Sequence, residues 1–87
     1  MYSSKIINGI EVFRVENDVN GNPRYVIHFL SLANNYNEAL NKARKIGGKK
    51  YRAKWFGGGI VFSSYNLEKD LKIMIGEQKW VLLKMKN

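Results

Sequence analysis

The chain has 87 residues, of which 45% are hydrophobic and 13% aromatic, with one proline and no cysteine. This length and apolar content predict a single globular domain, residues 1–87, with one modest core. The lack of cysteine excludes disulfides, thiolate metal sites and a cysteine nucleophile. Together with the absence of any long apolar run, it predicts a cytoplasmic protein without a membrane span.

The net charge of +8 is concentrated in one short segment. Residues 39–67 carry a charge of +7 and no acid, whereas residues 1–38 carry −1 and residues 68–87 carry +2. The seven cations are Lys42, Arg44, Lys45, Lys49, Lys50, Arg52 and Lys54. Because a block of like charge repels itself, this segment indicates an anionic partner more than a general aid to solubility.

The N-terminal part of the chain predicts a β-hairpin with a long loop. Residues 5–16 are rich in β-forming side chains, and the apolar positions change parity after Gly9, as they do at a bulge. Residues 17–23 form a dense turn cluster. Residues 24–31 then predict a second strand, which is apolar on both faces and is therefore expected to be central.

A helix is predicted to start at Asn35 and to end at the glycine pair 47–48. Asn35 and Glu38 have the spacing of a capping box. One apolar stripe follows the helical period, at Tyr36, Ala39, Leu40, Ala43 and Ile46. Lys42, Arg44 and Lys45 lie outside this stripe and are expected to face solvent.

The C-terminal half predicts a second hairpin, a helix and a last strand. Residues 49–56 alternate as a third strand, a tight turn follows at residues 57–59, and residues 60–64 form a fourth strand. Asn66 is expected to cap a helix that stops at Gly76, and residues 79–86 to form a fifth strand. The predicted fold is α+β: an antiparallel sheet of four to five strands with two helices, in the order β-hairpin–α–β-hairpin–α–β.

Side chains suited to catalysis are scarce. His28 is the single histidine, lies among apolar residues and has no acid near it in the sequence, which favours a structural role. The seven acids show no spacing typical of a zinc or hard-metal site. We therefore expect a protein that is not an enzyme and that carries no metal and no cofactor.

The candidate binding site follows the predicted third strand. Lys50, Arg52 and Lys54 occupy alternate positions, which would place a row of cations about 7 Å apart along a strand, close to the spacing of successive phosphates. Lys42, Arg44, Lys45 and Lys49 would extend this row. Phe56 shares the cationic face and is the candidate for stacking on bases, whereas Tyr51 and Trp55 are expected to point into the core.

The three glycines Gly57, Gly58 and Gly59 admit two interpretations. A hairpin turn is favoured, because neither a P-loop nor a dinucleotide-binding spacing surrounds them. Three glycines nevertheless exceed what a turn needs, and close approach of a partner's backbone is the second interpretation.

Two stretches of the sequence, residues 21–30 (GNPRYVIHFL) and residues 47–62 (GGKKYRAKWFGGGIVF), followed by residues 64–67 (SYNL), resemble small uncharacterised proteins encoded by phages and plasmids. This resemblance covers about half of the chain and transfers no functional residues. It implies a mobile-element origin, where small proteins bind nucleic acid, modulate transcription or inhibit host defence.

Charge and resemblance together favour a protein that binds DNA or RNA of arbitrary sequence through the basic segment. The alternative is a phage inhibitor of a host defence system, of the anti-CRISPR or antirestriction type, that contacts a host protein or ribonucleoprotein. A structural oligomer built on the apolar C-terminal segment is a third hypothesis.

Overall fold

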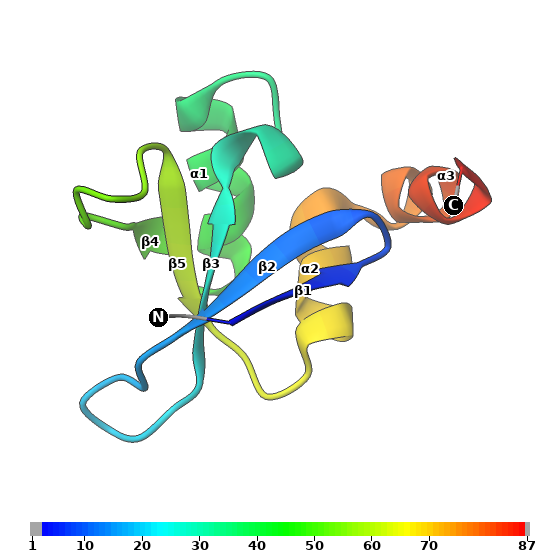
Figure 1. Cartoon of the computed structure of the whole chain (residues 1–87). Helices are drawn as coiled ribbons and strands as arrows, with labels where there is room; N and C mark the ends of the chain where they lie inside the picture. The colour runs from blue at the N-terminus through cyan, green and yellow to red at the C-terminus, as the bar shows by residue number, and fades with distance from the viewer. Residues whose placement is uncertain (1–2, 87) are drawn as a thin grey trace.

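Five strands pair in one antiparallel sheet in the spatial order β1-β2-β3-β5-β4 (Figure 1). The computed structural model describes residues 3–86. The strands are β1 (Ser4–Ile7), β2 (Ile10–Val15), β3 (Arg24–His28), β4 (Lys49–Lys50) and β5 (Gly59–Ser63). The helices are α1 (Tyr36–Ala43), α2 (Leu67–Ile75) and α3 (Glu77–Lys86), with 3₁₀ turns η1 (Phe29–Ser31) and η2 (Arg44–Ile46). The predicted α+β class is confirmed, whereas the order of elements differs.

The first predicted strand, residues 5–16, is a tight hairpin of two strands. Asn8 and Gly9 connect β1 to β2 and have φ values of 51° and 81°. Two consecutive left-handed residues are typical of a type I′ turn, for which Asn-Gly is a preferred sequence. The change of parity at Gly9 therefore marks a turn and not a bulge, and it adds an edge strand to the sheet.

The loop between β2 and β3, residues 16–23, is organised by Asp18. The Asp18 carboxylate accepts hydrogen bonds from the backbone N–H groups of Asn20 and Asn22 and from the Asn22 side-chain amide, each at 2.9 Å. These bonds, those from Asn22 foremost, hold the pKa of Asp18 below its ordinary value. The loop thus has a defined shape despite its length.

β3 is central, as predicted, but it is shorter than predicted. Val26 and Ile27 are fully buried, and they point to opposite faces of the sheet. The strand ends at His28 because its Nδ1 atom accepts a hydrogen bond from the backbone N–H of Leu30 at 3.2 Å, which caps η1. The predicted strand continued to residue 31, but this local hydrogen bond favours the turn η1 over further strand pairing.

α1 begins where the sequence predicts, but it ends at Ala43, before the predicted glycine pair. The Asn35 side-chain oxygen accepts a hydrogen bond from the backbone N–H of Glu38 at 2.9 Å, and the Asn35 amide donates to the Glu38 carboxylate at 3.3 Å. The chain then tightens into η2 and leaves it at Gly47, whose φ of 81° is the left-handed conformation of a C-terminal glycine.

The predicted third strand, residues 49–56, is wrong beyond Lys50. β4 has only two residues, paired with Val61 and Ile60 of β5, and one further hydrogen bond joins the Tyr51 N–H to the Gly59 carbonyl at 3.0 Å. A longer ladder would have to pair with residues 57 and 58, which are glycines and disfavour a strand. The chain forms a loop over residues 51–58 instead of a tight turn.

The last predicted strand, residues 79–86, is a helix. α2 is capped by Asn66, whose side chain accepts a hydrogen bond from the Lys69 N–H, and it ends at Gly76 with a φ of 97°. α3 follows at once. Its residues include good helix formers, and the helical period places Trp80 in the core while the next two residues are exposed.

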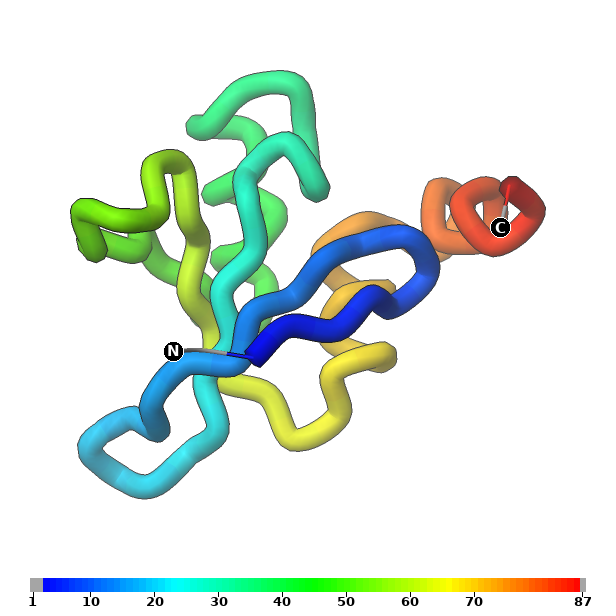
Figure 2. The backbone as a smooth tube through the Cα atoms, viewed as in Figure 1, coloured from blue at the N-terminus to red at the C-terminus, as the bar shows by residue number. Residues whose placement is uncertain are grey.

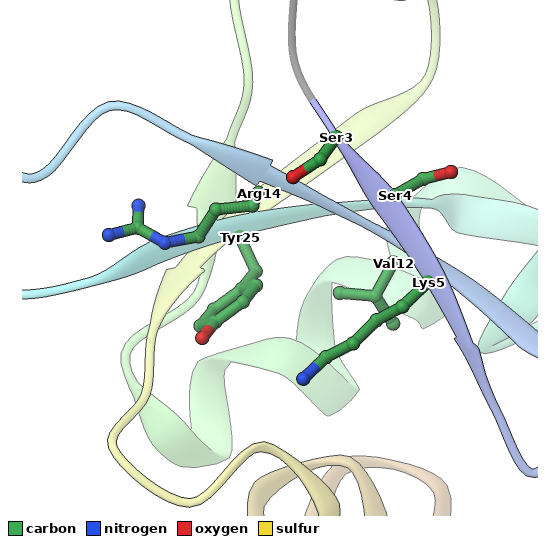
Figure 3. A pocket seen from close by; sticks show the side chains of 6 residues that line it. All are labelled: Ser3, Ser4, Lys5, Val12, Arg14 and Tyr25. Atoms are coloured by element: carbon green, nitrogen blue, oxygen red, sulfur yellow. The ribbon is translucent and has the colours of Figure 1, made fainter.

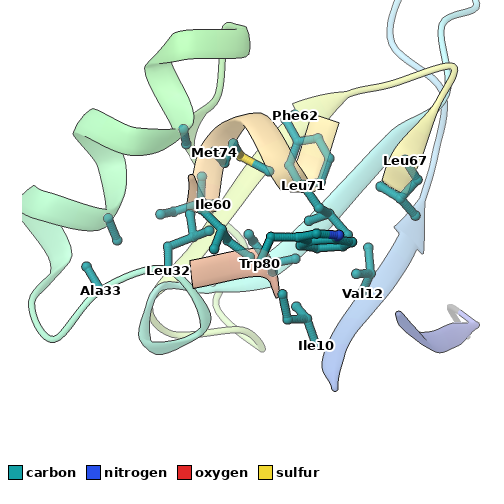
Figure 4. Close-up of a cluster of buried hydrophobic side chains, with 14 residues drawn as sticks. Ile10, Val12, Leu32, Ala33, Ile60, Phe62, Leu67, Leu71, Met74 and Trp80 are labelled. Atoms are coloured by element: carbon teal, nitrogen blue, oxygen red, sulfur yellow. The ribbon is translucent and has the colours of Figure 1, made fainter. Parts of the chain in front are cut away.

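The main core lies between the helices and one face of the sheet. Trp80 is only 3% exposed and belongs to the same buried cluster as Ile10 and Val12 of β2 and Leu71 of α2 (Figure 4). The Asn8 side-chain amide adds a hydrogen bond to the Trp80 carbonyl at 3.0 Å. One large side chain therefore anchors α3 to the sheet. No helix within residues 3–86 is long and apolar enough to cross a membrane.

Trp80→Ala tests this anchor. Loss of a buried indole and the resulting cavity should reduce the free energy of unfolding by ~3–5 kcal/mol, measured by urea denaturation. The matched control is Val81→Ala on the same helix, where the side chain is 48% exposed and the expected change is within about 0.5 kcal/mol. Equal stability of the two variants would contradict the packing of α3.

Candidate nucleic-acid interface

The cations of the basic segment, residues 42–54, lie on successive elements instead of one strand. Arg44 and Lys45 are in η2, Lys49 and Lys50 form β4, and Arg52 and Lys54 are in the loop that follows. All six are exposed. These exposed positive charges follow one another along the chain from η2 through β4 into the loop.

The predicted row of Lys50, Arg52 and Lys54 is not formed, because only Lys50 lies in a strand. Lys50 pairs with Ile60, whose side chain is in the helix-covered core, and its ammonium lies 6.0 Å from the centroid of the Tyr36 ring. This distance permits a cation–π interaction. Because Arg52 and Lys54 lie in a loop, the predicted match to regularly spaced phosphates is lost.

Lys42 is partly engaged by the fold. Its Nζ atom donates a hydrogen bond to the carbonyl of Leu32 at 2.9 Å and ties α1 to the segment that follows η1. Its side chain is half-buried, unlike the other six. Lys42 adds positive charge to the region, but it is the least available of the seven for a phosphate.

The loop of residues 51–58, here called the aromatic loop, packs through Phe56. The Phe56 ring meets the Phe13 ring of β2 in an edge contact, with centroids 5.0 Å apart. Cross-strand pairing places Phe13 on the same face as Val26, the face opposite the helices. Phe56 is therefore a cover for the second face of the sheet, and its predicted role as the exposed stacking side chain is not supported.

Trp55 takes the opposite position from the one predicted. Its side chain was expected in the core, yet Trp55 is 54% exposed. It contacts Phe56 and Tyr51 edge-on, with centroid distances of 5.4 Å and 5.8 Å. Trp55 directly follows Lys54 in the sequence, and Arg52 lies three residues before it. Sequence alternation misplaced it because the segment is not a strand.

Both ends of the aromatic loop are held by backbone hydrogen bonds. The Gly59 carbonyl accepts from the Tyr51 N–H at 3.0 Å and from the Tyr36 hydroxyl at 3.2 Å. Desolvation by partial burial raises the pKa of Tyr36. At the other end the Phe29 N–H donates to the Gly58 carbonyl at 2.9 Å. The loop encloses an open hollow of about 610 Å³ lined by Lys50, Arg52 and Lys54.

Two of the three glycines are explained by rings of the protein itself. A Cβ atom on Gly59 would lie 2.5 Å from Cδ1 of Phe56, and one on Gly58, at φ +76°, would lie 2.7 Å from Cδ1 of Phe29. Gly57 has open space where a Cβ would stand. The close contacts at Gly58 and Gly59 are thus with aromatic rings of the protein itself. Of the three glycines, Gly57 alone has open space beside its backbone.

Arg24 is a further cation near Lys49 of the basic segment. The charge pattern of the sequence did not indicate it, because Arg24 lies outside the acid-free residues 39–67. Arg24 and Lys49 line a hollow of about 200 Å³ together with Asp18 and Ser63. Arg24 pairs with Ser63 and Lys49 pairs with Val61, which places both cations on the same face of the sheet as Val26. The aromatic loop partly covers this face. No local pattern signals this meeting, because it depends on the sheet order.

A further hollow of about 320 Å³ lies at the β1–β3 end of the sheet, lined by Lys5, Arg14 and Tyr25 among others (Figure 3). The Arg14 guanidinium donates hydrogen bonds to the carbonyls of Val15 and Arg24 and lies 5.5 Å from the centroid of the Tyr25 ring. Arg14 thus supports the strand ends. Within residues 3–86 no group of three metal-ligating side chains comes together.

Gly59→Ala tests how the aromatic loop is held. The new methyl group should displace the Phe56 ring and reduce the free energy of unfolding by ~1–3 kcal/mol. Gly57→Ala, where a Cβ meets nothing within 4 Å, should change it by less than about 0.5 kcal/mol. Urea denaturation of both variants provides the measurement, and equal effects would show that Phe56 does not pack on Gly59.

The sequence matches a model of a known protein family. Residues 6–87 match the family model described as Staphylococcus phage terminal repeat-encoded protein TreK. No curated protein and no solved structure matches the chain. The match covers nearly the whole sequence and confirms the resemblance to small phage proteins that the two stretches indicated.

Proposed function

The chain belongs to the family of Staphylococcus phage terminal repeat-encoded protein TreK, and we propose that it is a non-catalytic nucleic-acid-binding protein. It contacts phosphates through the exposed cations of the basic segment and acts in the cytoplasm of the host cell. The observation that carries this proposal is the acid-free stretch of residues 39–67, in which six of seven cations are exposed.

The placement of charge supports the proposal more than its amount. Surface ion pairs occur elsewhere, for example between Lys72 and Glu77 and between Lys84 and Glu68, where α2 meets α3. The basic segment has no acid within it to neutralise its field. Cations gathered without counter-charges release condensed counterions when they meet a phosphate backbone, which favours binding at low salt.

The lysines of β4 also have a plainer role. β4 is an edge strand, and lysine on an edge discourages pairing with the edge of another molecule. Edge protection accounts for Lys49 and Lys50. It does not account for Arg52 and Lys54, which lie beyond the ladder in the aromatic loop. The excess of cations past the strand favours a binding role.

The alternative, inhibition of a host defence system by protein–protein contact, is favoured by one observation. α3 exposes Val81, Leu82 and Met85, and this helix lies at the opposite end of the molecule from the aromatic loop (Figure 2). Exposed apolar side chains of this kind are typical of protein contacts. Capture of a host protein that survives nuclease treatment, and that is lost on substitution of Leu82, would favour this alternative.

Neutralisation of selected cations tests the leading proposal. Wild-type protein should bind labelled oligonucleotides with a slope of log K against log salt of about −3 to −5, as for four to six phosphate contacts. The triple variant Lys49→Gln, Arg52→Gln, Lys54→Gln should weaken binding at least about tenfold and make the slope shallower by roughly 2 to 3.

The matched control removes the same charge from α2 and α3. Lys69→Gln, Lys79→Gln, Lys86→Gln also lowers the net charge by three, and these lysines are exposed. Binding by this variant should stay close to wild type. Equal losses in the two triple variants would mean that total charge alone acts, and absence of binding by wild type at low salt would refute the proposal.

A further inference from the structure

We infer that the aromatic loop binds single-stranded nucleic acid in preference to duplex, with Trp55 as the side chain on which an unpaired base stacks. This inference rests on the proposed nucleic-acid binding and adds the form of the strand and the contact that selects it. DNA and RNA single strands share the required chemistry, namely unpaired base faces joined by phosphates.

The exposure of Trp55 is the first observation. The two tryptophans of the chain have opposite environments: Trp80 is 3% exposed in the core and Trp55 is 54% exposed at the surface. A large apolar ring left in water forgoes the stabilisation that burial would supply. Its neighbour Phe56 fills the available place on the sheet, so the loop turns one ring inward and the other outward.

The orientation of the Trp55 ring is set before any ligand arrives. Tyr51 and Phe56 meet it at interplanar angles of 76° and 71°. Phe56 is in turn fixed to the sheet by Phe13 and by the backbone at Gly59. A ring held in this way loses little freedom when a base stacks on it, which favours affinity.

Two cations lie close to Trp55 in the sequence. Arg52 and Lys54 are exposed and precede Trp55 within the same loop, and both line the hollow that the loop encloses. In a single strand each base is flanked by phosphates, so a base stacked on Trp55 would bring phosphates to these side chains. Aromatic rings interleaved with cations are the usual means of sequence-tolerant single-strand binding.

A duplex fits this surface less well. Paired bases present only their edges in the grooves, and the major groove accepts a helix or a two-stranded ribbon. The cations around Trp55 lie on a loop, and the indole can reach a base face only if the stack is opened. Charge attraction by itself would favour the duplex, which carries more phosphate per unit length than a single strand.

The experiment compares one mixed-sequence 15-nucleotide strand, free and annealed to its complement, with a ribonucleotide strand of the same sequence. Fluorescence anisotropy measures affinity for wild type, Trp55→Ala, Trp55→Phe and a control on α2, Lys69→Gln. We expect tighter binding of the free strands than of the duplex. Trp55→Ala should weaken single-strand binding about 5- to 150-fold, Trp55→Phe should restore part of it, and duplex binding should change less than about twofold.

Tryptophan fluorescence of the unaltered chain provides a second measurement that does not depend on the folding of any variant. Stacking should quench Trp55 emission, while buried Trp80 supplies a constant background. Wild-type binding of strand and duplex with equal affinity, or without quenching, would overturn the single-strand inference and leave nucleic-acid binding intact. Failure of wild type to bind any of the three ligands would overturn both.

Discussion

The central strand β3 must be covered on both faces, and the rest of the structure depends on this constraint. Val26 and Ile27 are adjacent, point to opposite sides of the sheet and are both fully buried. The helices cover the Ile27 face. On the Val26 face the aromatic loop supplies Phe56, next to Phe13. A loop that packs on the sheet in this way is held in one shape by that packing.

The shape of the loop places the groups that we assign to function. Since Phe56 turns inward, the preceding Trp55 turns outward, and Arg52 and Lys54 remain in solvent. Gly59 makes this possible because a side chain there would displace the Phe56 ring. The same contact that completes the fold therefore leaves the neighbouring indole exposed, and the binding that we propose depends on the packing of the Phe56 ring.

Elements with a local signal could be predicted from the sequence. Asn35 and Asn66 cap α1 and α2 as expected, Gly47 ends the 3₁₀ turn that follows α1 and Gly76 ends α2, and β5 follows the predicted fourth strand within one residue. In each case the deciding interaction lies within a few residues of the signal. The exposure of the basic segment follows for the same reason, because charged side chains remain in water wherever the backbone goes.

Elements that depend on distant partners could not be predicted with the same success. The run from Trp80 to Leu83 suits a strand or a helix, and the choice was made by the fit of Trp80 against β2. β4 stops after Lys50 because its partner strand begins only at Gly59. Trp55 is exposed and Phe56 packs on the sheet, which is the reverse of the prediction. The alternation of side chains that holds in a strand does not apply to these residues, because β4 ends before them. The Asn8–Gly9 turn is the exception: its signal was local but was interpreted as a bulge.

We propose that the aromatic loop, held in shape by its packing against the sheet, is a binding surface. Two-dimensional NMR of the isotope-labelled protein, titrated with an unlabelled single-stranded oligonucleotide at low salt, tests this proposal. The amide signals of residues 49–58 and of the Trp55 indole N–H should shift, and those of α3 and the Trp80 indole should stay unchanged. Shifts confined to α3, or spread evenly over all exposed lysines, would contradict it.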